Sequence, residues 1–139
     1  MRPADLLAQI PLFQGLTDDD REALATRLTE KTFHPGDLVF SQGEAGVAMY
    51  VVKSGDLQIL DGNHVYETVS AGAVIGEMAV VDGGPRSATV RAIAPSVVIP
   101  VDQRRFLFMV QQTPFFALRL MGVMARRLRA MNERVKASD

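Results

Sequence analysis

The most informative part of the sequence is Ile75-Gly76-Glu77-Met78-Ala79-Val80-Val81-Asp82-Gly83-Gly84-Pro85-Arg86-Ser87-Ala88-Thr89-Val90. Its first glycine, Gly76, permits a sharp turn and the close approach of a ligand to the backbone. Residues 77–81 can form one helical turn whose free N–H groups attract anions. Arg86 offers a planar set of donors that suits a phosphate, with the Ser87 hydroxyl and the Ala88 N–H beside it. The stretch therefore predicts an anion-binding loop between two strands.

One carboxylate in this loop, that of Glu77, does not fit a simple anion site, because it repels phosphate. It fits a ligand that also donates a hydroxyl, such as the 2′-OH of a ribose. An acceptor and a cation on opposite sides of one loop suit a sugar phosphate. The alternative interpretation is an ion pair between Glu77 and Arg86, worth about 0–1 kcal/mol if it is exposed.

Outward from this loop, residues 31–101 alternate short β-rich runs with turn residues. We expect strands at residues 32–33, 38–40, 49–52, 57–60, 66–69, 89–92 and 97–99, besides the one that ends at Ile75. We expect turns at Pro35-Gly36-Asp37, Gln42-Gly43-Glu44, Ser54-Gly55-Asp56 and Asp61-Gly62-Asn63. Strand signals that recur about every 8–12 residues predict an antiparallel sandwich or small barrel.

Helical segments flank this β-rich middle on both sides. The first 30 residues are expected to be helical, with Thr17 as the N-cap of a helix that has three aspartates in its first turn. Asp102 is expected to cap a helix that ends near residue 112. Pro114 opens a second helix, since proline is tolerated at the first helical position, and this helix extends to about residue 136.

The last helix carries an apolar pattern with spacings of 4, 3, 4, 3 and 4, at Ala117, Met121, Met124, Leu128, Met131 and Val135. Such spacing is typical of the seam between two paired helices, and it predicts a homodimer through Met121, Met124, Leu128 and Met131. The alternative is that the same face docks on the chain's own β-core.

Composition excludes several classes of function. The 139-residue chain has no cysteine, which excludes disulfide scaffolds, cysteine-ligated zinc and thiol catalysis. Its two histidines, His34 and His64, are 30 positions apart in two turns. Because they form no cluster of metal ligands, we expect neither a metal nor an enzymatic activity. The first nine residues do not resemble a signal peptide, and no apolar run approaches the roughly 18 residues that span a bilayer.

Charge is unevenly distributed along the chain. Residues 1–70 hold 5 basic and 11 acidic side chains, whereas residues 71–139 hold 10 and 5, and the net charge is −1. The basic half could face an anion or could be an exposed helix face. The chain as a whole has no field that would attract nucleic acid.

Residues 75–90 resemble the phosphate-binding cassette of cyclic nucleotide-binding domains. The resemblance rests on Gly76-Glu77 at the start and Pro85-Arg86-Ser87-Ala88-Thr89 at the end, with the usual spacing between them. It extends to Ile10-Pro11-Leu12-Phe13, to the turns at Pro35-Gly36-Asp37, Gln42-Gly43-Glu44 and Val52-Lys53-Ser54-Gly55, and to Met124-Ala125-Arg126-Arg127-Leu128. The last of these is similar to the long C-terminal helix of the bacterial catabolite-activator branch of the family.

The resemblance implies an α+β fold, an antiparallel eight-stranded, jelly-roll-like β-roll flanked by N-terminal helices and two C-terminal helices. It implies a single domain over residues 1–139. Its expected parts are N-terminal helices at 1–30, a β-roll at 31–101 with the cassette at 75–90, and C-terminal helices at 102–139.

The resemblance also implies roles for individual residues. Glu77 matches the position that accepts the ribose 2′-OH, and Arg86 the position that pairs with the cyclic phosphate. Ser87 matches a position whose hydroxyl contacts phosphate or guanine, while Gly76 and Ala88 match donors of backbone N–H groups. The expected ligand-binding set is completed by Met78 and Ala79, with a lid over the base formed by Arg127, Leu128, Met131 and Asn132.

The expected function is therefore a regulatory module that binds cyclic AMP, or cyclic GMP, and signals by repositioning its C-terminal helices to an unidentified protein partner. A bacterial, cytoplasmic setting is expected, without a membrane contact. Direct DNA binding is not expected, because the sequence stops at Asp139, where a helix-turn-helix would begin. Two alternatives are the sensor half of a truncated transcription regulator and a dimerisation domain whose nucleotide site is vestigial.

Overall fold

Two antiparallel sheets form the centre of the computed structural model, which describes residues 5, 7–8, 16–25, 28–46, 48–112 and 114–138, and the side chains of all of these except 112, 114–116 and 134–138. The strands are β1 (Lys31–Phe33), β2 (Leu38–Phe40), β3 (Met49–Ser54), β4 (Leu57–Asp61), β5 (His64–Val69), β6 (Val74–Ile75), β7 (Thr89–Ala92) and β8 (Ser96–Val101). The described helices are α2 (Asp18–Ala25), α3 (Glu77–Asp82), α4 (Gln103–Gln112) and α5 (Pro114–Ser138).

The eight strands divide equally between the sheets. One sheet has the order β1-β8-β3-β6 and the other the order β2-β7-β4-β5, and every pairing among them is antiparallel. The two sheets face each other across one apolar cluster that includes Phe40, Val52, Ile59 and Val90. The expected α+β fold with an eight-stranded β-roll is thus confirmed, and so are the helices on its flanks.

Strand β3 shows why the sequence folds into layers. Alternate residues of a strand point to opposite faces of the sheet. Tyr50 and Val52 therefore enter the cluster between the sheets, whereas Met49 and Val51 enter a second cluster beneath the helices. Because both faces are covered there, the first four residues of β3, Met49 to Val52, form a continuous run of buried residues rather than an alternating pattern.

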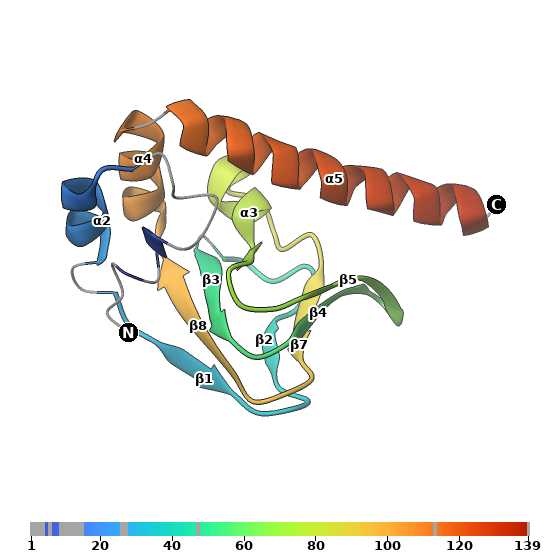
Figure 1. The fold of residues 1–139 in the computed structure, drawn as a ribbon. Helices are drawn as coiled ribbons and strands as arrows, with labels where there is room; N and C mark the ends of the chain where they lie inside the picture. Colours follow the sequence, from blue (N-terminus) through green and yellow to red (C-terminus); the bar gives the residue numbers. More distant parts are fainter. Residues whose placement is uncertain are drawn as a thin grey trace.

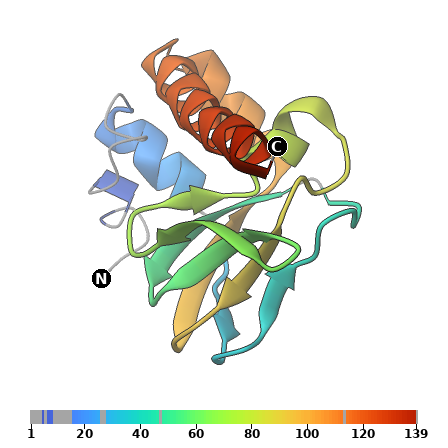
Figure 2. The ribbon, with the colours of Figure 1, turned by 90° about the vertical axis from the view of Figure 1, so that its right-hand side faces the viewer.

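The C-terminal helices lie across one end of the β-roll (Figure 1). Phe106 and Met109 of α4 and Leu120 of α5 pack on the apolar cluster outside β3 and β8. Figure 2, which looks nearly along α5, shows this helix beside α3 and above the sheets. In the described part of the chain no helix combines the length and the apolar character needed to cross a membrane.

Two helix starts form as the sequence predicts, and one helix end does not. The Thr17 hydroxyl accepts a hydrogen bond from the Asp20 N–H at 3.1 Å, and the Asp102 carboxylate accepts one from the Arg105 N–H at 2.8 Å. The expectation of helix throughout residues 1–30 is wrong at its end, because α2 stops at Ala25 and residues 28–30 are irregular. The chain must become extended there, since β1 pairs with β8 from its first residue. The apolar stop at residues 10–13 lies outside the described residues.

Some of the apolar residues of α5 pack against the rest of the chain, and others are exposed to solvent. Met124 packs on the cluster beneath the helices, and Met131 lines a cavity described below. Met121 and Leu128 are instead 58% and 51% exposed, beside Leu118 at 62%. Of the predicted seam, Met124 and Met131 therefore face the chain's own body, whereas Met121 and Leu128 are exposed. With Leu118, which was not part of the predicted seam, they form an exposed ridge, Leu118-Met121-Leu128.

Candidate functional site

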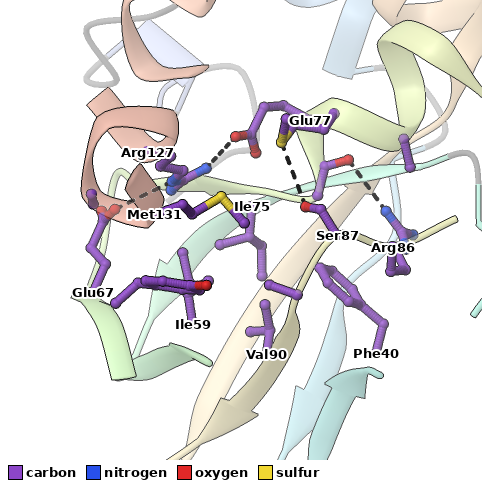
Figure 3. A pocket seen from close by; sticks show the side chains of 16 residues that line it. Phe40, Ile59, Glu67, Ile75, Glu77, Arg86, Ser87, Val90, Arg127 and Met131 are labelled. Atoms are coloured by element: carbon purple, nitrogen blue, oxygen red, sulfur yellow. Dashed lines mark hydrogen bonds and ion pairs between the residues drawn. The ribbon is translucent and has the colours of Figure 1, made fainter. Parts of the chain in front are cut away.

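A cavity opens between the second sheet, α3 and α5. It holds about 580 Å³ of open space, including solvent at its mouth, and its lining is mostly apolar. Figure 3 shows Arg86 beside Phe40 at one end and Glu67, Arg127 and Met131 at the other. The cavity therefore has two polar ends, each with an arginine, that are separated by an apolar floor.

Arg86 is a buried cation whose charge the described residues leave uncompensated. Its side chain reaches back beneath α3, and the residue is only 5% exposed. Its Nη1 atom donates to the carbonyl oxygens of Ala48 at 2.8 Å and of Gly76 at 3.2 Å, while its Nε atom has no hydrogen-bond partner. The guanidinium carbon lies 4.2 Å from the centre of the Phe40 ring. Burial of a charge without a counter-charge is costly, so an anion bound here would be strongly stabilised.

Two glycines leave the space that this guanidinium occupies. Gly76 adopts φ +77°, and a Cβ added to it would lie 2.7 Å from the Arg86 Nη1 atom. A Cβ on Gly46 would lie 2.6 Å from both the Nε and the Nη2 atoms of Arg86. A glycine is thus required at position 76 for two reasons, the left-handed backbone and the arginine that packs against it.

The other end of the cavity is built on Arg127 of α5. Its Nη1 atom donates to Glu77 Oε1 at 2.6 Å, its Nη2 atom to the Val74 carbonyl at 2.7 Å, and its Nε atom to Glu67 Oε1 at 3.3 Å. Burial acts to lower the pKa of Arg127, but the charges and hydrogen bonds of Glu77 and Glu67 outweigh it and raise that pKa above its ordinary value. The alternative of an ion pair between Glu77 and Arg86 is therefore wrong, because Arg127 takes the carboxylate.

The structure brings most of the predicted site residues together. The cassette residues Gly76, Glu77, Met78, Ala79, Arg86, Ser87 and Ala88 all line the cavity. The Ser87 hydroxyl lies 3.5 Å from the Met78 sulfur. Of the four expected lid residues, Arg127 and Met131 line the cavity, whereas Leu128 and Asn132 are exposed and do not. The roles expected for these residues toward a ligand stay predictions.

Other lining residues were not expected from the sequence. Phe40, Ile59, Tyr66, Glu67, Ile75, Val90 and Ala130 also line the cavity. They come from five strands and from α5, and no local motif marks them. A weak signal existed for the strand residues, since alternate positions of β4 and β7 are apolar. Among the described residues there is no group of three or more His, Asp or Glu side chains that could hold a metal ion.

Comparison with known proteins gives a consistent result. Residues 30–113 match the cyclic nucleotide-binding domain family. The chain is 31% identical over 124 residues to an uncharacterized NTE family protein of Mycobacterium tuberculosis, covering 88% of this chain and 21% of that protein. It is 29% identical over 124 residues to the cyclic AMP receptor protein of Thermus thermophilus, covering 86% of this chain and 57% of that protein.

Among solved structures, cAMP-bound PfPKA-R (residues 141–441) superposes with a TM-score of 0.86 at 23% identity, over 94% of this chain and 45% of that chain. At this identity the likeness shows the shared fold alone. The chain spans between about a fifth and three fifths of the length of the two curated relatives. The activities of those whole proteins therefore belong to them.

Proposed function

Because the chain belongs to the cyclic nucleotide-binding domain family, we propose that its cavity binds a 3′,5′-cyclic purine nucleotide, cyclic AMP in preference to cyclic GMP. The observation that carries the proposal is Arg86, a buried guanidinium for which the described residues supply carbonyl oxygens and aromatic rings but no carboxylate. A cyclic phosphate carries one negative charge and would compensate it. The printed name of the Thermus relative supports cyclic AMP as the ligand.

The proposed roles follow the positions of the side chains. Arg86 pairs with the cyclic phosphate, assisted by the Ser87 hydroxyl and by the N–H groups of Gly76 and Ala88. Glu77 accepts the ribose 2′-OH, and Met78 and Ala79 close the cavity wall on the α3 side. Near α5, Met131 contacts the base. Leu128 and Asn132 would reach the ligand only if α5 moved.

The proposed signal passes through Glu77, since this one carboxylate faces both the ribose position and α5. In the structure it accepts a 2.6 Å hydrogen bond from Arg127. A ribose hydroxyl that binds Glu77 would share or displace that bond, and so would shift the position of α5. A ligand changes such an equilibrium only by binding the two positions with different affinity.

The exposed ridge Leu118-Met121-Leu128 supports contact with a second copy or with a downstream protein. Sedimentation of Met121→Glu and Leu128→Glu variants tests the homodimer, which we expect both substitutions to dissociate. The similarity to the Thermus receptor also supports a second candidate, in which the chain is the sensing part of a longer transcription regulator. That candidate places no DNA contact on the described residues.

The proposed module binds its ligand without converting it, and it acts as one domain in a bacterial cytoplasm, a setting that the bacterial relatives support. Recovery of unchanged cyclic nucleotide after prolonged incubation with the protein tests the first part. Appearance of a linear nucleotide would contradict it.

Calorimetric titration tests the binding proposal directly. Cyclic AMP and cyclic GMP are titrated into wild type and into Arg86→Lys, which keeps the charge but loses the planar pair of donors. The matched control is Arg91→Lys on β7, the strand that follows Arg86, because the Arg91 guanidinium bonds Gln58 at 2.9 Å and does not line the cavity. We expect about a tenfold or greater loss for Arg86→Lys and none for Arg91→Lys. Absence of wild-type binding at submillimolar ligand would contradict the proposal.

A further inference from the structure

A row of residues crosses the floor of the cavity from one polar end to the other. Phe40 of β2 is the register partner of Val90 of β7, and Val90 is the partner of Ile59 of β4. Ile59 is in turn the partner of Glu67 of β5, beside an irregularity of the ladder at Tyr66. The row spans three gaps between strands, or about 14 Å at about 4.8 Å each. Figure 3 shows its labelled members in this order, with Arg86 at the Phe40 end.

This row sets the direction in which the proposed ligand lies. A phosphate paired with Arg86 sits over β2, so the nucleotide must extend across β7 and β4. Its base then arrives at β5, where Tyr66 lines the cavity. The base end is therefore formed by the β4–β5 hairpin together with α5.

Two residues of this short hairpin contact the side chain of Tyr66. The hydroxyl of Tyr66 donates to Asp61 Oδ2 at 2.9 Å. The ring of His64 meets the Tyr66 ring edge-on, with centres 5.2 Å apart and planes at 79°. Asp61 and His64 are themselves register partners at the hairpin turn. The hydrogen bond to Asp61 thus directs the hydroxyl proton of Tyr66 toward the hairpin turn.

That hydrogen bond fixes the polarity that Tyr66 presents to a ligand. A tyrosine hydroxyl has one proton and two lone pairs, and an ionised carboxylate can only accept. Since the proton is directed to Asp61, any hydrogen bond between this hydroxyl and a base is one that the hydroxyl accepts. Adenine offers a donor there, its exocyclic amino group, whereas guanine has a keto oxygen at the same ring position.

The apolar lining groups at this end do not distinguish the two kinds of base, since Met131 and Ile59 contact any purine alike. Arg127 is the cationic donor at this end, and three of its five N–H groups bond Glu77, Val74 and Glu67.

We propose that Tyr66, oriented by Asp61, is the residue that makes the cavity select a base with an amino group over a base with a keto group at ring position 6. The inference rests on the proposed function. It assigns the choice of base to a hydrogen bond within the β4–β5 hairpin, outside the cassette that binds the phosphate.

Three ligands with the same ribose and phosphate isolate this contact. They are cyclic AMP, cyclic inosine monophosphate, which has a keto oxygen at position 6 and a proton on the neighbouring N1, and purine riboside 3′,5′-cyclic monophosphate, which has only hydrogen at position 6. We expect wild type to bind cyclic AMP about tenfold or more tightly than the inosine compound, since one bond is replaced by two facing acceptors. Tyr66→Phe should lower that ratio to about threefold or less and leave the affinity for the purine riboside compound unchanged.

A second variant reverses the direction of the hydrogen bond at the Tyr66 hydroxyl instead of removing the hydroxyl. In Asp61→Asn the side-chain amide can donate to the Tyr66 oxygen and free the hydroxyl proton for a keto group, so the ratio should shift toward the inosine compound. Thermal unfolding of both variants confirms that the hairpin is intact. A wild-type ratio retained in both variants would overturn the inference while leaving the proposed function standing. Failure of wild type to bind any of the three ligands would overturn both.

Discussion

Two arginines lie at opposite ends of one cavity, and the protein compensates the charge of only one. Arg127, whose side chain is 14% exposed, bonds two carboxylates, Glu77 and Glu67. Arg86 is more deeply buried, yet in the described residues it meets only backbone carbonyls and the faces of Phe40 and Tyr50. A buried charge without a counter-charge lowers the free energy of unfolding, so an unpaired Arg86 indicates a role other than stabilising the fold.

The difference in charge compensation assigns the two arginines to different properties, ligand binding for Arg86 and stability for Arg127. A cation already paired gains little from an additional anion, so Arg127 anchors α5 to the cassette. A cation left unpaired gains much, so we expect Arg86 to bind the proposed ligand. Substitution of either arginine should therefore change mainly one of two measured quantities, nucleotide affinity for Arg86 and the free energy of unfolding for Arg127.

The largest effect is expected for Arg86→Met, which replaces the guanidinium with an apolar chain of similar reach. Loss of the charge should weaken cyclic nucleotide binding by about 2–5 kcal/mol, or roughly 30- to 5,000-fold. The unliganded variant should keep its free energy of unfolding within about 1 kcal/mol, since relief of the unpaired charge offsets two lost hydrogen bonds. Calorimetric titration and urea unfolding measure the two quantities.

Of the two measurements on Arg86→Met, the free energy of unfolding without ligand is the more discriminating one. A variant destabilised by about 3 kcal/mol or more would show that Arg86 is a structural cation with a compensating partner, and the comparison with Arg127 would fail. Wild type itself should gain thermal stability on addition of cyclic nucleotide, and Arg86→Met should not, because the gain follows from the ligand bound to the native state.

The next largest effect is expected for Arg127→Met. Its removal leaves Glu77, whose side chain is 3% exposed, as an unpaired buried carboxylate. We expect a loss of about 3 kcal/mol in the free energy of unfolding. The double variant Arg127→Met/Glu77→Gln should recover much of it, and a double-mutant cycle by urea unfolding measures the coupling. Equal stability of the single and double variants would contradict the ion pair as the anchor.

The pH dependence of this anchor follows from the direction of its pKa shift. The pKa of Arg127 is raised in the folded state, so the stability that it contributes is complete below the ordinary value of an arginine. It is lost only as the pH rises through the folded value. From the Arg127 proton we therefore expect no change in stability across neutral and mildly alkaline pH.

The same two arginines show how far the sequence alone leads. The loop that carries Arg86 has its glycine turn, helical turn and arginine within residues 75–90, so local chemistry was sufficient to predict this loop as an anion site. The contacts of Arg86 with Phe40, Ala48 and Tyr50 were not predicted, because they join distant parts of the chain. The strands were predictable for the same reason as the loop, since alternation of apolar residues and turn signals are local properties. The site of Arg86 was thus predicted as an anion site before any contact was known.

Arg127 could not be placed in this way, because its contacts join positions 50 and 60 residues apart in the chain. The heptad pattern of α5 identified its apolar residues but not which of them face the β-roll. Gly46 was missed for a related reason, since its importance comes from a guanidinium 40 positions later. Register between strands and the rotation of a helix are set by packing, which sequence patterns constrain only weakly.

A smaller effect is expected at the turn beneath Arg86. Gly76 and Gly83 both have positive φ, +77° and +69°, and a Cβ on Gly83 would meet nothing within 4 Å. Gly83→Ala should therefore cost about 1 kcal/mol for its backbone alone. Gly76→Ala should cost about 2 kcal/mol, because its Cβ also meets the Arg86 Nη1 atom at 2.7 Å. Urea unfolding of the pair tests this, and equal costs would show that the guanidinium moves aside freely.

The smallest effect is expected at the outer carboxylate of Arg127. Glu67 has a side chain that is 43% exposed, and its Oε1 atom lies 3.3 Å from the Arg127 Nε atom, against 2.6 Å between Glu77 Oε1 and Nη1. Solvent screens such a pair, so Glu67→Gln should change the free energy of unfolding by less than about 0.5 kcal/mol. Glu77→Gln, measured beside it by urea unfolding, should cost several times more. Equal costs would mean that Arg127 is held equally by β5 and by the cassette, and a ligand that competes for Glu77 would then leave α5 anchored through Glu67.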